Sequence, residues 1–119
     1  MDKEQFLQAV SVQKLDSEKV SVIQEIYGFT PTEEIKKIIS ICDESVFIGD
    51  ECRLLAYSEI QNASEELHVD FAGQKILPLF DYFDNDFIVW HFDEQNWSMY
   101  NITDQIAFKV REHLSDLLR

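Results

Sequence analysis

Apolar residues recur three and four positions apart in the first third of the chain, and this spacing predicts helices. The residues that carry it are Phe6, Leu7 and Val10 for a short first helix, and Val20, Ile23, Ile26 and Tyr27 for a second one. Asp16 or Ser17 is suited to cap the second helix, because both side chains accept hydrogen bonds from free backbone N–H groups. Gly28 is placed to end that helix in the left-handed region.

The segment "TPTEEIKKIISIC" predicts a third helix with a defined start. Thr30 is the expected cap, Pro31 the first helical residue, and Glu33 the partner in a capping box. The apolar positions follow the pattern i, i+3, i+4, i+7 and are Ile35, Ile38, Ile39 and Cys42. This pattern places Cys42 on the buried stripe, as a small apolar residue.

The spacing of apolar residues then changes from helical to alternating. The segments "SVFIG" and "RLLAY" flank the turn Gly49-Asp50-Glu51 and predict two short strands. A helix is expected to follow, with Ser58 as its cap and Gly73 after its end. Its apolar face is expected to consist of Ile60, Ala63, Leu67 and Phe71.

Three further strands are predicted in "KILPLF", "DFIVWHF" and "WSMYNI", between residues 75 and 102. The turns between them contain Asp84-Asn85 and residues 93–96, whose side chains favour chain reversal. In the middle strand both faces are apolar, so we expect it to lie centrally and to be covered on both sides.

The last segment, "TDQIAFKVREHLSDLL", predicts a closing helix over 103–118, capped by Thr103. Its expected stripe consists of Ile106, Val110, Leu114 and Leu117. A single α+β domain over 1–119 is therefore expected, in which helices pack on a mainly antiparallel sheet. The length of 119 residues, with only 3 glycines and 2 prolines, fits one such domain without long linkers.

Acidic residues dominate the charge of the chain. It has 23 Asp and Glu against 10 Lys and Arg, a formal net charge of −13. Most of the excess lies in residues 41–96, where Arg53 and Lys75 are the only bases. Such a field disfavours binding to nucleic acid and to anionic membranes, and it speeds association with a basic protein. The alternative interpretation is that the charge serves solubility alone.

The N-terminal sequence "MDKEQFLQAVSVQ" has no apolar core of a secretory signal, and no apolar run reaches the ~20 residues that span a bilayer. We therefore expect a cytoplasmic protein in which Cys42 and Cys52 are reduced.

Motifs for chemistry were sought around the acidic turns. No register starting at Asp81 or Asp84 supplies the ligands of an EF-hand calcium loop. The pairs His68/Asp70 and His91/Asp93 lack a third metal ligand. The chain has neither a G-x-S-x-G nucleophile motif nor a glycine-rich phosphate loop. We therefore expect no enzyme activity, no metal and no cofactor.

The aromatic residues of "LFDYFDNDFIVWHFDEQNW" divide into two expected groups. The core group consists of Phe80, Phe87, Trp90 and Phe92, together with Val89. The group expected at the surface consists of Tyr82, Phe83, Trp97 and Tyr100. Aromatic side chains beside acidic turns are typical of protein-binding surfaces.

The order of these segments resembles the SUKH superfamily, which includes the yeast cell-wall-synthesis regulator and many bacterial immunity proteins. The resemblance spans roughly residues 17–118. It rests on "YGFTPTEEIKKIIS", on "RLLAYSEI" leading into a helix, and on "KILPLFDYFDNDFIVWHFDEQNWSMYNI". Two positions depart from the family's usual pattern: the turn "FDND" lacks the expected glycine, and Cys42-Asp43-Glu44 stands in place of a frequent Asn-Gly.

The resemblance implies an α+β domain without known catalysis, whose bacterial relatives neutralise a cognate toxin by direct binding. Applied to this chain, it suggests an immunity protein that blocks a basic toxin domain, for example a nuclease. A regulatory or scaffolding module that binds another cellular protein is the alternative. We expect a monomer or weak homodimer. The residues predicted to steer association are Asp81, Asp84, Asp86, Asp93 and Glu94, with Trp97 and Tyr100 as anchors.

Overall fold

The computed structural model describes residues 1–118, and the fold is α+β. The helices are α1 (Lys3–Ser11), α2 (Ser17–Tyr27), α3 (Glu33–Ile41), α4 (Tyr57–Leu67), α5 (Phe71–Gln74) and the short 3-10 helix η1 (Leu114–Asp116). The strands are β1 (Val46–Ile48), β2 (Cys52–Leu54), β3 (Ile76–Asp81), β4 (Asp86–His91), β5 (Asn96–Asn101) and β6 (Ile106–Arg111).

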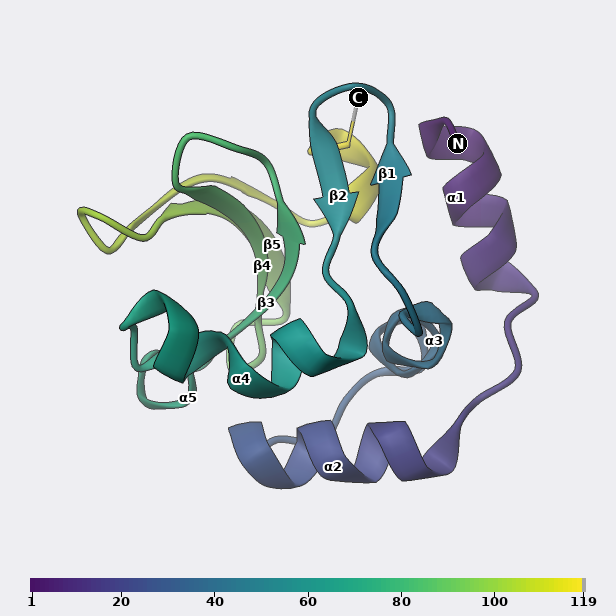
Figure 1. Cartoon of the computed structure of the whole chain (residues 1–119), viewed down its shortest axis with the longest axis horizontal. Helices are drawn as coiled ribbons and strands as arrows, with labels where there is room; N and C mark the ends of the chain where they lie inside the picture. The colour runs from purple at the N-terminus through teal and green to yellow at the C-terminus, as the bar shows by residue number, and fades with distance from the viewer. Residues whose placement is uncertain (119) are drawn as a thin grey trace.

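All six strands form one antiparallel sheet in the order of the sequence, β1-β2-β3-β4-β5-β6 (Figure 1). Each strand therefore pairs with its neighbours in the chain, and β4 lies between β3 and β5. This confirms the predicted antiparallel sheet and the central position of the strand at 86–91. Short turns make such a meander the simplest connection between successive strands.

Both faces of the central sheet are covered. Phe80 pairs with Ile88, and Tyr100 pairs with the preceding residue, Phe87. Because successive side chains of a strand alternate, Phe80 and Tyr100 point to opposite faces of the sheet. Phe80 meets Phe6 of α1 with ring centroids 5.7 Å apart, and Tyr100 meets Phe71 of α5 at 6.2 Å. Coverage on both sides explains why β4 and β5 each bury four consecutive residues.

The predicted helix starts are partly confirmed. Asp16 caps α2, and its carboxylate accepts a hydrogen bond from the Lys19 N–H at 3.2 Å. The third helix begins later than predicted. Thr32, not Thr30, is its cap and accepts from the Ile35 N–H at 3.3 Å. Thr32 takes the cap position because it is extended and lies directly before the first helical turn, where its hydroxyl can accept a hydrogen bond.

The predicted helix after Ser58 is two helices, α4 and α5. Ser58 is not the cap. Instead the Glu59 carboxylate accepts a hydrogen bond from the Ala56 N–H at 3.0 Å, at the start of α4. His68 ends α4 in the left-handed region, and Asp70 caps α5 through the Gly73 N–H. Phe71 therefore lies on a separate helix and not on the apolar stripe of α4.

The predicted closing helix over 103–118 is wrong. Residues 106–111 form β6, and only the turn η1 follows it. Of the expected stripe, Leu114 and Leu117 are buried, whereas Ile106 is 58% and Val110 51% exposed. Asn101 directs the reversal, because its side-chain oxygen accepts hydrogen bonds from the N–H groups of Thr103 and Asp104. The chain is thereby turned back along the open edge of β5.

Replacing Gly28 by alanine is expected to destabilise the fold by about 1 kcal/mol. Gly28 ends α2 at φ 74°, where a side chain is disfavoured, although a Cβ there would meet no atom within 4 Å. The cost is therefore conformational and not steric. Urea denaturation checks it, with Gly28→Asn as the control, because asparagine tolerates the left-handed region better than alanine. An alanine variant as stable as the parent protein would contradict this account.

Candidate functional site

The predicted partner-binding acids lie at two different ends of the sheet. Asp81, Asp84 and Asp86 surround the β3–β4 turn, whereas Asp93 and Glu94 lie in the β4–β5 turn. Successive turns of an antiparallel meander fall at opposite ends of its strands. The five acids therefore do not form one surface.

Three acidic turns lie at the end of the sheet that carries Asp84. These turns span residues 49–51, 82–85 and 102–105, and they contain no Lys or Arg. We call their acids, with Asp86 at the start of β4, the acidic tip. Its members are Asp50, Glu51, Asp84, Asp86 and Asp104. In Figure 1 the β1–β2 turn is at the top and the yellow-green β5–β6 turn at the far left, with the green β3–β4 turn between them.

Specific contacts hold these turns beside one another. The Ile102 N–H donates to the Asn85 carbonyl at 2.9 Å, which links the β5–β6 turn to the β3–β4 turn. The Asn101 amide donates to the Asp86 carboxylate, also at 2.9 Å. A hollow of 310 Å3 joins Tyr82 to the β1–β2 turn. Phe83, in the β3–β4 turn, is 41% exposed.

Asp81 has a structural role in a charged cluster. Arg53 donates through both terminal nitrogens to Glu59, at 2.6 and 3.0 Å, and also to Asp81 at 3.2 Å. All three side chains are half-buried. The hydrogen bonds from Arg53 lower the pKa of Glu59, and those to Glu59 raise the pKa of Arg53. Asp81 is thus paired within the fold, in a cluster of one cation and two carboxylates.

At the opposite end of the sheet, Asp93 forms an exposed ion pair with Lys75 at 2.9 Å. The hydrogen bond to Asp93 raises the pKa of Lys75. Glu94 is exposed beside His91. Burial lowers the pKa of His91, and the charge of Glu94 opposes that shift. This end therefore has a mixed charge, in contrast to the acidic tip.

The two predicted aromatic anchors do not reach the surface. Trp97 is 0% exposed, with its ring 5.1 Å from Trp90 and 6.4 Å from Phe80. Tyr100 is 2% exposed, and its hydroxyl donates to Gln74 of α5 at 2.6 Å. The prediction that these residues flank the turns at the surface is wrong. Both residues belong to β5, which is covered on both faces, so side chains that point to either face are buried.

Nucleophilic groups are present but buried. His91 Nε2 lies 2.7 Å from Ser98 Oγ, yet Ser98 is 0% exposed and no substrate reaches it. Burial raises the pKa of Cys42 to about 11 and that of Cys52 to about 12. Both thiols are therefore protonated at neutral pH and are poor nucleophiles. As predicted, Cys42 is a core residue.

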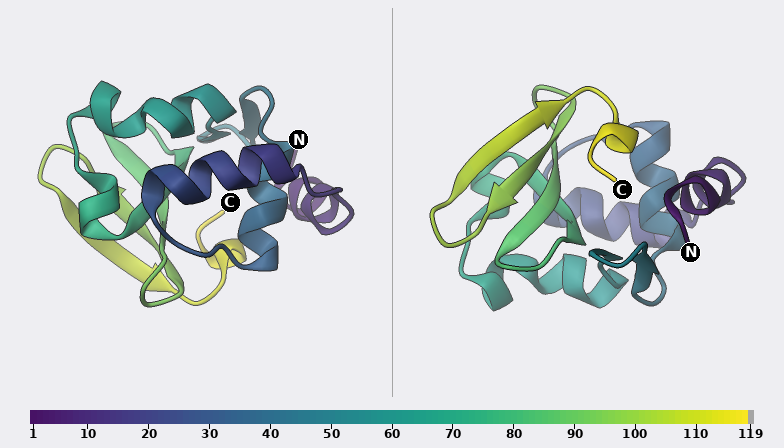
Figure 2. Two further views of the ribbon diagram at one scale, coloured as in Figure 1. Left: turned by 90° about the horizontal axis from the view of Figure 1, so that it is seen from below. Right: turned by 90° about the horizontal axis from the view of Figure 1, so that it is seen from above.

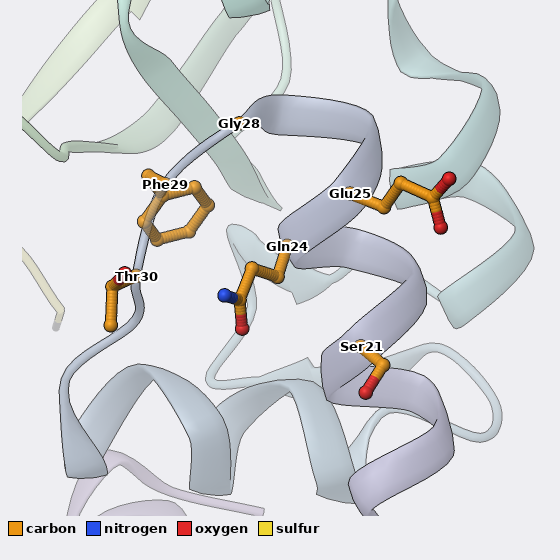
Figure 3. A pocket seen from close by; sticks show the side chains of 6 residues that line it. All are labelled: Ser21, Gln24, Glu25, Gly28, Phe29 and Thr30. Atoms are coloured by element: carbon orange, nitrogen blue, oxygen red, sulfur yellow. The ribbon is translucent and has the colours of Figure 1, made fainter.

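Two large hollows lie along α2, away from the acidic turns. One of 540 Å3 is open to solvent and contains Ser21, Gln24 and Thr30 (Figure 3). Phe29 also lines it and stacks on Phe92, with ring centroids 4.5 Å apart. A neighbouring hollow of 610 Å3 contains Lys19 and Tyr57. Neither hollow brings a strong nucleophile beside a general base.

Within residues 1–118, no three His, Cys, Asp or Glu side chains are grouped so that they could hold a metal ion. No helix in the same range has both the length and the apolar composition of a transmembrane segment.

Comparisons with known proteins give no relative. No family model matches the sequence. A search of curated proteins and a search of solved structures also return no match. The functional proposal therefore rests on the arrangement of the residues described above.

Sequence reasoning missed three acids of the tip, namely Asp50, Glu51 and Asp104. The first two were assigned to a turn, but the pairing of β2 with β3 was needed to place that turn beside residues 82–85. Asp104 was assigned to a helix. One signal was available for it: β3, β4, β5 and β6 begin at residues 76, 86, 96 and 106, so a strand after the turn continues a regular ten-residue spacing.

Proposed function

We propose that this protein is a non-enzymatic protein-binding domain that neutralises a basic toxin domain by direct contact. The observation that carries the proposal is the acidic tip, where three turns that contain no Lys or Arg lie at one end of the sheet. The resemblance to the SUKH superfamily supports an immunity role for such a surface. The proposed binding surface is therefore the acidic tip, which is smaller than the acidic region of residues 41–96 that the sequence suggested.

The proposed mechanism is electrostatic steering followed by occlusion. A surface of one sign raises the rate of encounter with an oppositely charged partner, and it does so most strongly at low ionic strength. Asp50, Asp84 and Asp104 come from three separate turns, so they can contact a basic cleft at several points. Phe83, exposed in the β3–β4 turn beside Asp84, supplies the apolar contact that Trp97 and Tyr100 cannot supply from the core.

Replacing Asp50, Asp84 and Asp104 together by asparagine is expected to slow association with the cognate toxin about tenfold at low salt. The salt dependence of the association rate should also become shallower. Stopped-flow or surface-plasmon kinetics over a range of ionic strength measure both. Asn suits position 84, whose φ is 53°, because it tolerates the left-handed region.

A matched control carries Glu25, Glu65 and Glu66 changed to glutamine, which removes the same formal charge from exposed helical positions. If both triple variants slow association equally, net charge and not the acidic tip is responsible. If neither variant changes the kinetics, the steering mechanism is wrong.

The immunity role itself is tested by co-expression with a toxin-like domain encoded beside this gene. Rescue of growth together with a stable complex supports the role. A complex with a cellular protein, without any rescue, would instead favour the regulatory or scaffolding alternative that the resemblance also implies.

A further inference from the structure

We infer that β6 binds an extended acidic segment of another protein, which adds to the sheet as a seventh strand and places a carboxylate between Lys109 and Arg111. Three features of β6 lead to this assignment: its open edge, its exposed apolar side chains and its two cations. The surface has the opposite charge to the acidic tip and adjoins it, because Tyr82 of the β3–β4 turn also lines the hollow that contains the two cations.

The outer edge of β6 has no strand beside it in residues 1–118. β6 is the last strand of the sheet order, and Figure 2 shows it at the outside of the sheet. The Ile102 N–H bonds to Asn85, so the backbone groups of residue 102 point toward β4. Because backbone direction alternates along a strand, the N–H and C=O groups of residues 97, 99 and 101 point toward β6. Their partners in β6 include Ile106 and Phe108. The intervening Ala107 consequently directs its N–H and C=O groups to the open edge.

The opposite edge of the sheet is different. The Gly49 N–H donates to the Met1 carbonyl at 2.9 Å, and the Met1 nitrogen donates to the Phe47 carbonyl at 3.1 Å. The backbone at Met1 thus already occupies the edge of β1. Of the two edges, β6 is the one that offers backbone groups to a partner strand.

Exposed apolar side chains flank this edge. Ile106 and Val110 are more than half exposed, and Phe108 is half-buried. Peptides that add to a sheet edge gain affinity from backbone hydrogen bonds and specificity from alternate side chains. Ile106 provides an apolar contact on one face of the added strand, and Val110, which the register shift between Trp97 and Met99 places on the opposite face, provides one there.

The charge of β6 identifies the chemistry of the partner. Lys109 and Arg111 are its charged residues, in a chain of net charge −13. Neither forms an ion pair with any residue of 1–118. Both line one hollow of 190 Å3, whose floor contains the buried side chains of Met99 and Leu117. Asp116 also lines this hollow, so its charged side chains, two cations and one carboxylate, sum to one positive charge.

A β-bulge directs the cations and limits the pairing. The register shifts between Trp97 and Met99, so that Lys109 and Val110 together oppose Ser98, and Lys109 has φ 53°. Bulges interrupt the ladder and re-aim side chains, and they also protect edges against indiscriminate pairing. A partner strand is therefore expected to pair beside Ala107 and to meet Lys109 and Arg111 through its own carboxylate.

The test uses a capped heptapeptide that alternates valine with glutamate, added to the 15N-labelled full chain. Amide signals of Ile106–Arg111 are expected to shift, at an ionic strength where the Debye length of about 8 Å screens the distant acids. The same peptide with glutamine in place of glutamate is expected to bind at least tenfold more weakly. The variant Lys109→Gln/Arg111→Gln should lose this preference, whereas the control Lys14→Gln should keep it.

Each other outcome overturns the inference. Equal binding of the two peptides would mean that the cations do not recognise the segment. Absence of shifts in Ile106–Arg111 would exclude the edge as the binding surface. If inorganic phosphate or acetate alone shifts the same amides at the concentration at which the peptide binds, the hollow is a small-anion site and not a docking site for a strand. Binding of a basic toxin at the acidic tip is measured in a separate experiment, and its result does not depend on the outcome at β6.

Discussion

Replacing Trp97 by alanine is expected to lower the free energy of unfolding by about 3–5 kcal/mol. The side chain is fully buried between β4 and the residues that cover the sheet, and it contacts Trp90 and Phe80. Alanine would remove the apolar surface of the indole and leave a cavity that the surrounding strands can fill only in part. Urea denaturation followed by circular dichroism measures the change.

The matched control is Phe83→Ala, because Phe83 is also aromatic and lies near the same sheet but is exposed. Its effect on stability should stay within about 0.5 kcal/mol. Its effect on partner binding should be the larger one. The reverse result, in which Trp97→Ala is as stable as the parent protein but fails to bind, would place Trp97 on the partner surface after all.

Replacing Arg53 by methionine is expected to cost about 2 kcal/mol at pH 7. The change keeps much of the side-chain length but leaves the carboxylates of Glu59 and Asp81 half-buried without their cation. The expected cost is below that of a fully buried pair, because water still reaches part of all three side chains. Lys36→Met is the control, since its ion pair with Glu33 is on the surface.

The cost of losing Arg53 should depend on pH in a defined direction. Arg53 holds the pKa of Glu59 below its usual value, so this interaction stabilises the fold above the unfolded pKa of about 4.3. Its contribution is lost as the pH falls through the lowered folded pKa. The stability difference between the parent protein and Arg53→Met should therefore be full at pH 7 and shrink below about pH 4. A difference that stays constant to pH 3 would show that packing, and not charge, is what Arg53 contributes.

Local patterns in the sequence determined much of the fold. The presence of α1, the start of α2, its end at Gly28 and the strands β3 to β5 all follow from residues that lie close together in the chain. Caps, left-handed glycines and alternating apolar residues act over one or two turns of chain, so they can be interpreted without knowledge of distant partners. The α+β class follows from the same signals.

The segment 103–118 shows where local patterns fail. Ile106, Val110, Leu114 and Leu117 have helical spacing, and Thr103 is a plausible cap. Yet Ile106, Phe108 and Val110 also favour a strand, and the open edge of β5 offered hydrogen-bond partners that no local signal contains. Strand pairing with β5 overrode the helical spacing, as tertiary context commonly does for short segments.

The candidate site was determined by tertiary structure more than the fold was. The sequence by itself established an acidic chain with polar turns between its strands, and it supplied Asp84 and Asp86 as surface candidates. Only the pairing of β2 with β3, and of β5 with β6, decided that Asp50, Glu51 and Asp104 lie at the same end as these two. The burial of Trp97 and Tyr100 was likewise decided by helices that cover both sheet faces. The physical reason is that turn position and burial depend on contacts between segments far apart in sequence, whereas composition and spacing report only near neighbours.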